Sequence, residues 1–257
     1  MLPFLLLSPR RSPAVAGAEY RDFLRAAGLE EEQLVHRMLD SENSRLGDLR
    51  GFSGVFVGGS DLNETDARHS RWQQNVNVQL AGLLAAPVPV LSVCYGGSAI
   101  ARSTGGEIGR THPENAGATT VELTAAGKAD AVFGALPASF TALTGHTENI
   151  TALGPNATLL ATGPSCPVQA VRYGERLWTC QFHSEMDADA MRVRMGFFHG
   201  HGYYDDAEFD AIVSGLPLVD TSAPRTLLRS FVAHAAADAA RRRARAVADA
   251  HVPALVG

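Results

Sequence analysis

Short apolar runs alternate with longer amphipathic segments in the first half of the chain, and this alternation limits the fold more than any other feature. The apolar runs are predicted to be strands, and they cover residues 4–9, 33–39, 54–59 and 87–93. Helical periodicity is found in the intervening and following segments, at residues 16–28, 67–86 and 94–106. Alternating strands and helices form a parallel sheet with helices on both faces. The chain is therefore predicted to be an α/β protein with an open, mostly parallel sheet flanked by helices.

The second half of the chain has a different pattern. Short β-prone segments joined by turns follow one another between residues 119 and 183, and we expect them to complete the sheet. An Ala-rich helix is predicted over residues 221–251. We therefore divide the chain into a main domain, residues 1–205, and a helical C-terminal extension, residues 206–257, packed on it. The RRRAR cluster at 241–245 is interpreted as a solvated helix face rather than an interaction patch.

Composition and charge exclude some classes of protein. Hydrophobic residues make up 46% of the chain and charged residues 19%, which leaves ample material for a globular core. The net charge of -5 argues against a nucleic-acid partner, because neutralising phosphates needs a surplus of Lys and Arg. Three cysteines are too few, and odd in number, for a disulfide framework. A reducing, cytoplasmic location is expected.

The N-terminal apolar run at residues 2–7 could be mistaken for part of a signal peptide. No basic residue precedes it, however, and it is shorter than the apolar region of a signal peptide. We interpret it as a buried first strand. No apolar stretch in the sequence approaches the length of a membrane span, so no membrane partner is expected.

Cys94 lies where the apolar run 87–93 meets the next helical segment, in the sequence VLSVCYGG. A sharp turn between strand and helix lifts such a side chain above the edge of the sheet, as in nucleophile elbows. The helix N-terminus would favour a thiolate, and its free N–H groups could donate to an oxyanion. Gly96 and Gly97 keep bulk away from the bend. Cys94 could instead be a small buried hydrophobe, but this context favours a nucleophile.

A His-x-Glu pair supplies the groups that a cysteine nucleophile needs. The apolar run that starts at residue 177 ends in His183, Ser184 and Glu185. In extended chain, residues two apart point the same way, so the carboxylate of Glu185 could orient the imidazole of His183. A third element, VFVGGS at residues 55–60, places two glycines at the end of a predicted strand. Ligands bind at these strand ends in open α/β sheets.

These three segments resemble, in the same order, motifs of class I glutamine amidotransferases. VFVGGS resembles the family's oxyanion-strand loop, PVLSVCYGGSAIARSTGG its nucleophile segment PVLGICxGxQxxAxxxGG, and QFHSE its QFHPE segment. The similarity covers roughly residues 50–190. The subgroup it resembles most is that of the free-standing, GMP-synthase-like amidotransferases, whose fold is flavodoxin-like.

The resemblance implies a role for individual residues. Cys94 would be the nucleophile, His183 the general base and acid, and Glu185 its partner. The main-chain N–H groups of Gly59 and Tyr95 would form the oxyanion hole. The family's substrate contacts would fall at three further residues: Ser98, His146 and Thr147. No metal or organic cofactor is implied, and ammonia released from L-glutamine would pass to a separate synthetase subunit.

Ser98 departs from the family pattern, because members usually carry Gln at this position, four residues after the cysteine. This difference keeps a second hypothesis open, a γ-glutamyl hydrolase or peptidase that uses the same Cys–His–Glu chemistry on a larger γ-glutamyl compound. A third hypothesis is a non-catalytic regulatory protein on the same fold, and the complete triad argues against it.

Several other polar residues are candidates with weaker support. His199 and His201 lie near acidic residues, but without a third spaced cluster they are not assigned to a metal site. His112 and Glu114 are expected in a loop after the nucleophile helix, from which they could approach the site, but they are not assigned to it. Core positions are expected for Cys180, Trp72 and Trp178, and nothing marks Cys166 as reactive.

Overall fold

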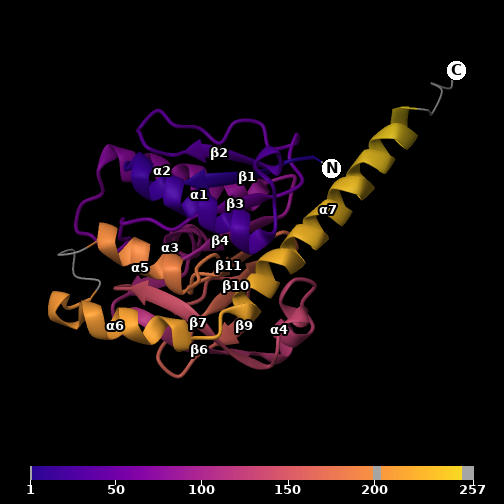
Figure 1. Cartoon of the computed structure of the whole chain (residues 1–257). Helices are drawn as coiled ribbons and strands as arrows, with labels where there is room; N and C mark the ends of the chain where they lie inside the picture. The colour runs from indigo at the N-terminus through magenta and orange to yellow at the C-terminus, as the bar shows by residue number, and fades with distance from the viewer. Residues whose placement is uncertain (1, 199–203, 251–257) are drawn as a thin grey trace, which may run out of the picture.

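One sheet of nine strands runs through the molecule in the order β2-β1-β3-β4-β11-β10-β9-β6-β7 (Figure 1). The structure is a computed structural model, and it describes residues 2–198 and 204–250. Half of the sheet is parallel, and it consists of β2 (Leu34–Met38), β1 (Phe4–Ser8), β3 (Val55–Val57), β4 (Val90–Val93) and β11 (Leu177–Cys180). The carboxyl ends of β1, β3, β4 and β11 therefore meet at one edge.

The rest of the sheet is antiparallel. It consists of β10 (Ala170–Tyr173), β9 (Ala157–Thr162), β6 (Glu114–Leu123) and β7 (Ser139–His146). The α/β class and the flanking helices are confirmed, and the sheet is mixed because the segments after residue 106 pair by antiparallel connections. A separate two-stranded sheet, β5 (Glu107–Gly109) with β8 (Asn149–Ala152), was not predicted.

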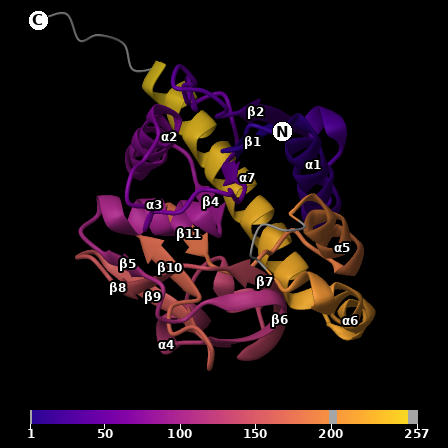
Figure 2. The same ribbon diagram turned by 90° about the vertical axis from the view of Figure 1, so that its left-hand side faces the viewer.

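Helices cover both faces of the sheet (Figure 2). Their bounds are α1 (Pro13–Ala27), α2 (Arg71–Gly82), α3 (Tyr95–Ser103), α4 (Ala125–Lys128), α5 (Ala188–Phe197), α6 (Phe209–Gly215) and α7 (Ser222–Ala250). Successive strand residues point to opposite faces. Phe4 and Leu6 of β1 accordingly pack in the core under α1 and α7, whereas Leu5 and Leu7 pack in the core under α2 and α3.

The predicted helix at 16–28 is α1, and its ends have clear causes. The Ser12 side chain accepts a hydrogen bond from the N–H of Val15, and Pro13 occupies the first turn, where its missing N–H costs nothing. Gly28 ends the helix in the left-handed conformation, with φ of 68°, which glycine adopts without strain. Helix α1 matters for the site because it carries a buried glutamate, Glu19, toward the edge where the parallel strands end.

The long C-terminal helix is confirmed as α7. Leu227, Phe231 and Ala235 on its first half are buried in the core that it shares with α1 and the sheet. Its last turns extend past the sheet (Figure 1). Within the RRRAR cluster, Arg242 bonds to Asp238 and to the carbonyl of Phe52, so this arginine fixes the helix to the domain. The division of the chain at residue 205 stays a prediction.

The cysteines and tryptophans occupy the interior. All three cysteines, Cys94, Cys166 and Cys180, are free and buried. Trp72 and Trp178 are buried in the two cores, as expected. In the part of the chain that the structure describes, no helix is both long and apolar enough to cross a membrane.

Candidate active site

Cys94 occupies a strained turn between β4 and α3. Its backbone has φ of 54° and ψ of -114°, a conformation that residues other than glycine rarely adopt. The turn is held by a hydrogen bond from the Cys94 N–H to the Cys180 carbonyl, at 2.8 Å, and by another from the Gly97 N–H to the Cys94 carbonyl, at 2.9 Å. A side chain at Gly96 would collide with Ser92, since a Cβ there would lie 2.0 Å from its hydroxyl oxygen. The expected elbow is present.

His183 lies between Cys94 and Glu185. Its Nδ1 is 2.7 Å from Glu185 Oε1, and its ring lines the same pocket as Cys94. Strand β11 ends at Cys180, earlier than predicted, but the His183 N–H donates to the Leu143 carbonyl at 2.8 Å and forms a bridge to β7. The predicted extended conformation ends at this bridge, because Ser184 and Glu185 form a turn, and it is this turn that places Glu185 beside His183. The structure thus brings together the three residues predicted as the triad.

The electrostatics favour a charged His183–Glu185 pair. Burial by itself would lower the pKa of His183, but the charge of Glu185 and the hydrogen bonds with Cys94 and Glu185 raise it to about 10. Burial would raise the pKa of Glu185, and the charge of His183 together with the hydrogen bond between them lowers it. His183 is therefore an imidazolium at neutral pH in this arrangement, ready to give a proton to a leaving group.

Gly59, a predicted oxyanion-hole residue, lies beside the triad. A Cβ built on Gly59 would be 3.2 Å from His183 Cε1 and 3.8 Å from the Cys94 Cβ. Its N–H, however, donates to Glu19 Oε1 at 3.1 Å. The N–H is therefore engaged by the protein in this structure, and it must leave Glu19 or share its hydrogen to serve an oxyanion. Tyr95 is the first residue of α3, so its N–H lies outside the hydrogen bonds of the helix.

Glu19 is a buried carboxylate that sequence reasoning missed. Besides the Gly59 N–H, it accepts hydrogen bonds from the Ser8 hydroxyl at 2.8 Å and from Arg10 Nε at 3.1 Å. Arg194 of α5 lies 3.5 Å from the same carboxylate and 3.3 Å from Asp22. Glu19 thereby connects the ends of β1 and β3 to α5. Its position inside an ordinary helix gave no signal in the sequence.

A polar pocket opens on one side of Cys94, and we call it the Ser98 pocket. The residues that line it are Ser60, Leu62, Asn63, Cys94, Tyr95, Ser98, Gly145, His146, Thr147, Glu148 and Gln181. All three predicted substrate contacts, Ser98, His146 and Thr147, therefore lie around one cavity next to the nucleophile. Their roles toward a substrate stay predictions, because no ligand is bound.

The polar groups in the Ser98 pocket differ in whether they are available to form hydrogen bonds with a ligand. Both ring nitrogens of His146 face acceptors, with Nδ1 2.9 Å from the Glu148 carbonyl and Nε2 2.8 Å from Glu114 Oε2. A substrate could therefore bond to this ring only by displacing a partner. The Thr147 hydroxyl donates to Asn63 at 2.9 Å. By contrast, the Ser98 hydroxyl is buried and has no hydrogen-bond partner among the described residues.

Glu148 was not predicted to contribute to the site. One of its oxygens, Oε2, accepts the Thr65 N–H at 3.0 Å, while Oε1 has no hydrogen-bond partner in the described structure. Only 5% of the residue is exposed. Burial raises the pKa of this carboxyl, which shows that its charge is not neutralised by a nearby cation. A ligand with a positive charge would satisfy it.

The expectation that Glu114 lies in a loop is wrong. Glu114 is the first residue of β6, and it is buried beside His146 and Cys166, with potential metal-ligand atoms of the three within 4.8 Å of one another. Its carboxylate already accepts hydrogen bonds from five side chains, those of Thr119, Thr144, His146, Ser165 and Gln169. Burial would raise its pKa, but these hydrogen bonds lower it to about 2. Because five side chains already donate to this carboxylate, we interpret Glu114 as a residue that holds the His146 ring in place, and we assign no metal to it.

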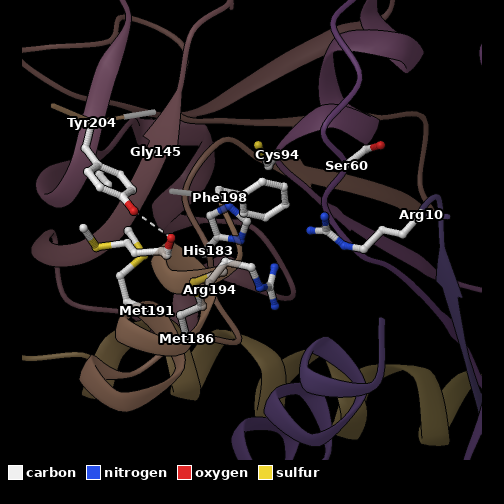
Figure 3. Close-up of a pocket in the computed structure, with 12 residues that line it drawn as sticks. Arg10, Ser60, Cys94, Gly145, His183, Met186, Met191, Arg194, Phe198 and Tyr204 are labelled. Carbon is white, nitrogen blue, oxygen red and sulfur yellow. Dashed lines mark hydrogen bonds between the residues drawn. The ribbon is translucent and has the colours of Figure 1, made fainter. Parts of the chain in front are cut away.

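A second, largely apolar pocket opens on the other side of Cys94, and we call it the His183 pocket (Figure 3). The residues that line it are Arg10, Ser60, Cys94, Ala116, Gly145, His183, Met186, Met191, Arg194, Met195, Phe198 and Tyr204. Half of these residues come from α5 and the segments on either side of it. His199 and His201, the candidates for a metal site, lie outside the described residues.

The fold and the site together define a class of protein, an α/β protein with a cysteine at a strand–helix elbow and a His–Glu pair beside it. Residues 36–199 match the family described as glutamine amidotransferase class-I. Because this match covers more than half of the chain, the protein belongs to that family.

The matched relatives are larger than the region they share with this chain. The chain is 31% identical over 133 residues to one subunit of the glutamine-hydrolysing GMP synthase of Thermococcus kodakarensis, an alignment that covers 51% of this chain and 65% of the relative. It is 36% identical over 105 residues to a glutamine-hydrolysing GMP synthase of Parafrankia sp., covering 40% of this chain and 19% of the relative. The matches thus span less than two thirds of either relative.

Solved structures show the same fold. A glutamine amidotransferase from Thermotoga maritima matches with a TM-score of 0.73 and 19% identity, covering 92% of this chain and 99% of the other. One from Methylobacillus flagellatus matches with a TM-score of 0.69 and 17% identity, covering 93% and 95%. At these identities the likeness establishes the fold alone.

Proposed function

We propose that this protein hydrolyses the side-chain amide of L-glutamine through a thioester on Cys94 and releases ammonia for a separate acceptor. The observation that carries the proposal is the position of His183, which lines the same pocket as Cys94 and lies 2.7 Å from Glu185. A nucleophile, an acid–base group and its orienting carboxylate are the parts that amide hydrolysis by a cysteine requires.

In the first half of the reaction, the Cys94 sulfur attacks the amide carbon of glutamine. The C–S bond forms, the carbonyl oxygen becomes an oxyanion, and His183 then gives its proton to the nitrogen as the C–N bond breaks. Acid–base help of this kind contributes about 10²–10⁴-fold in rate. Ammonia leaves, and the γ-glutamyl group remains on Cys94 as a thioester.

In the second half, neutral His183 takes a proton from water, and the hydroxide attacks the thioester. Glutamate leaves and the Cys94–His183 pair is restored. Tyr95 offers its N–H to the oxyanion in both halves, and one such donor contributes about 10²–10³-fold. Gly59 can add a second donor once its N–H turns from Glu19 toward Cys94.

We expect the glutamyl group of the substrate to bind in the Ser98 pocket. Glutamine carries an α-ammonium group, and the unpaired Oε1 of Glu148 is the buried anion that would bind it. The free hydroxyl of Ser98 can donate to or accept from the amide or the α-carboxylate. Because serine is shorter than the glutamine usual at this position in the family, the pocket has more room beside Cys94.

We further propose that the ammonia acceptor is a separate synthetase subunit, and that the reaction takes place in the cytoplasm. Several relatives are named as a single subunit of a glutamine-hydrolysing GMP synthase, a designation that implies at least one other subunit. The identity of the acceptor for this chain does not follow from that name.

Ammonia release from L-glutamine by the purified protein tests the proposal, with Cys94→Ala as the control. Release by the wild type and not by the variant supports it. If the wild type releases no ammonia and a glutamine-like diazoketone does not modify Cys94, the site is not a working glutaminase and the regulatory hypothesis takes its place.

A further inference from the structure

The two pockets beside Cys94 can be assigned to the two sides of the scissile bond. His183 borders the apolar pocket and is absent from the lining of the Ser98 pocket, whereas Cys94 borders both. The leaving nitrogen must lie within hydrogen-bond reach of the group that protonates it. If His183 has that role, the leaving amine faces the His183 pocket and the acyl group faces the Ser98 pocket.

Ammonia does not need the His183 pocket. The pocket extends from Cys94 to Met191 and Met195 of α5, whereas ammonia is a single heavy atom. Its walls carry the side chains of Met186, Met191 and Met195, together with those of Phe198 and Tyr204 (Figure 3). Methionine side chains adapt to irregular apolar ligands, and burying apolar surface against them favours binding. The chemistry of these walls fits an apolar group attached to the leaving nitrogen.

Two guanidinium groups form the polar side of the same pocket. Arg10 is tied to Glu19 through Nε, and its guanidinium carbon lies 5.9 Å from the centre of the Phe198 ring. Arg194 is 5% exposed, and its Nε and Nη1 have no hydrogen-bond partner among the described residues, although its charge is paired with Glu19 and Asp22. A carboxylate carried by the leaving amine would therefore lie beside the positive charge of these two guanidinium groups at the edge of the apolar wall.

We propose that the site also cleaves γ-glutamyl amides whose amine carries an apolar group and a carboxylate, that is, γ-glutamyl dipeptides with an apolar C-terminal residue. This inference rests on the Cys94 chemistry proposed above. The γ-carbonyl carbon bonds to Cys94 Sγ, the C–N bond breaks, and His183 protonates the free amino group of the leaving amino acid. Water then hydrolyses the thioester, so the products are glutamate and the apolar amino acid.

Steady-state hydrolysis of γ-glutamyl-leucine, γ-glutamyl-glycine and L-glutamine by the full chain tests the inference. An apolar side chain in a fitting pocket is worth about 10-fold or more in kcat/KM, so γ-glutamyl-leucine should exceed γ-glutamyl-glycine by at least that factor. Equal rates for the two dipeptides, or no cleavage of either, would overturn the inference. Ammonia release from L-glutamine in the same assay shows separately whether the proposed function stands.

A pair of variants on one helix links the preference to the pocket. Met191→Glu places a carboxylate inside the apolar wall, and Val193→Glu places the same charge on the side of α5 where Val193 is 39% exposed. The ratio of kcat/KM for γ-glutamyl-leucine to that for γ-glutamyl-glycine should fall by about 10-fold in Met191→Glu and stay at the wild-type value in Val193→Glu. A wild-type ratio in both Met191→Glu and the milder Met191→Ala would show that the His183 pocket does not bind the leaving group.

Discussion

The main-chain N–H of Gly59 donates a 3.1 Å hydrogen bond to the carboxylate of Glu19, which belongs to α1 and is fully buried. The same carboxylate pairs with Arg10 and Arg194. The loop beside Cys94 is thus attached to a buried charge cluster, and its geometry depends on residues that take no part in the chemistry. This dependence has a consequence for stability.

Glu19→Ala is expected to destabilise the protein by about 3–5 kcal/mol, because it leaves two buried guanidinium groups without their shared partner. Urea unfolding of the wild type and the variant measures the difference. Ser12→Ala, which removes only the N-cap of the same helix, serves as the control and should cost about 1 kcal/mol. A Glu19→Ala loss no larger than that of the control would contradict the role given to this carboxylate.

Glu185→Gln should lower kcat for glutamine hydrolysis by about 10²–10⁴-fold, because the amide keeps the shape of the side chain but removes the charge that holds His183 protonated and oriented. Initial rates of ammonia release measure it. A variant that retains more than about a tenth of the wild-type kcat would mean that Glu185 does not act on the reaction through His183.

The same pair predicts how stability depends on pH. The pKa of His183 is raised in the folded protein, so its contribution to stability is complete below the unfolded pKa near 6.5 and is lost as the pH rises toward about 10. The wild type should therefore lose more unfolding free energy than Glu185→Gln between pH 7 and pH 10. Parallel curves for the two proteins over this range would rule out a charged pair.

Glu114 gives the opposite pH dependence. Its pKa is lowered to about 2, so its contribution is complete above the usual glutamate pKa of about 4.5 and is lost as the pH falls toward 2. Glu114→Gln should therefore lose less unfolding free energy than the wild type between pH 5 and pH 2, and it should be the less stable protein at pH 7. Equal acid sensitivity of the two proteins would argue that the carboxylate is already protonated at neutral pH.

Glu148→Gln is expected to raise KM for L-glutamine by about 10–100-fold with little change in kcat, since a hydrogen bond to a charged group is worth about 1.5–3 kcal/mol. Glutaramic acid, the monoamide of glutaric acid, lacks the α-ammonium group and is the matched substrate. Its KM should be nearly the same for the wild type and the variant. If both substrates lose affinity equally, Glu148 supports the pocket without binding the ammonium group.

Much of the fold and the triad could be predicted because their signals are local. Cys94 lies between an apolar run and the glycines at 96 and 97, and this pattern predicts a sharp turn between a strand and a helix. His183 and Glu185 are two residues apart, so their pairing could be predicted from the sequence, although the chain joins them through a turn and not through the extended conformation that was expected. Their relation to Cys94 needed only the rule that parallel strands end at a common edge.

The surroundings of the triad could not be predicted, because they depend on contacts between distant segments. In the sequence, Glu19 cannot be distinguished from other glutamates of an amphipathic helix. Its role depends on the packing of α1 against the Gly58–Gly59 turn, which is so close that a Cβ on Gly58 would collide with the Glu19 carboxylate. Glu114 enters the site region through its pairing with His146 across β6 and β7. Met191 and Met195, which line the His183 pocket, are four residues apart on one face of α5, but nothing in the sequence indicates that this face lies beside Cys94.

Trapping the covalent intermediate decides whether Cys94 carries the glutamyl group during the reaction. The quantity to measure is the mass of the intact protein after a brief reaction with L-glutamine, stopped with acid. We expect a fraction of the wild-type chain to carry one γ-glutamyl group, located on Cys94 by peptide mapping and lost on treatment with a thiol nucleophile. Glutamate formation without any such adduct on Cys94, or an equal rate of ammonia release by Cys94→Ala, would contradict the thioester mechanism.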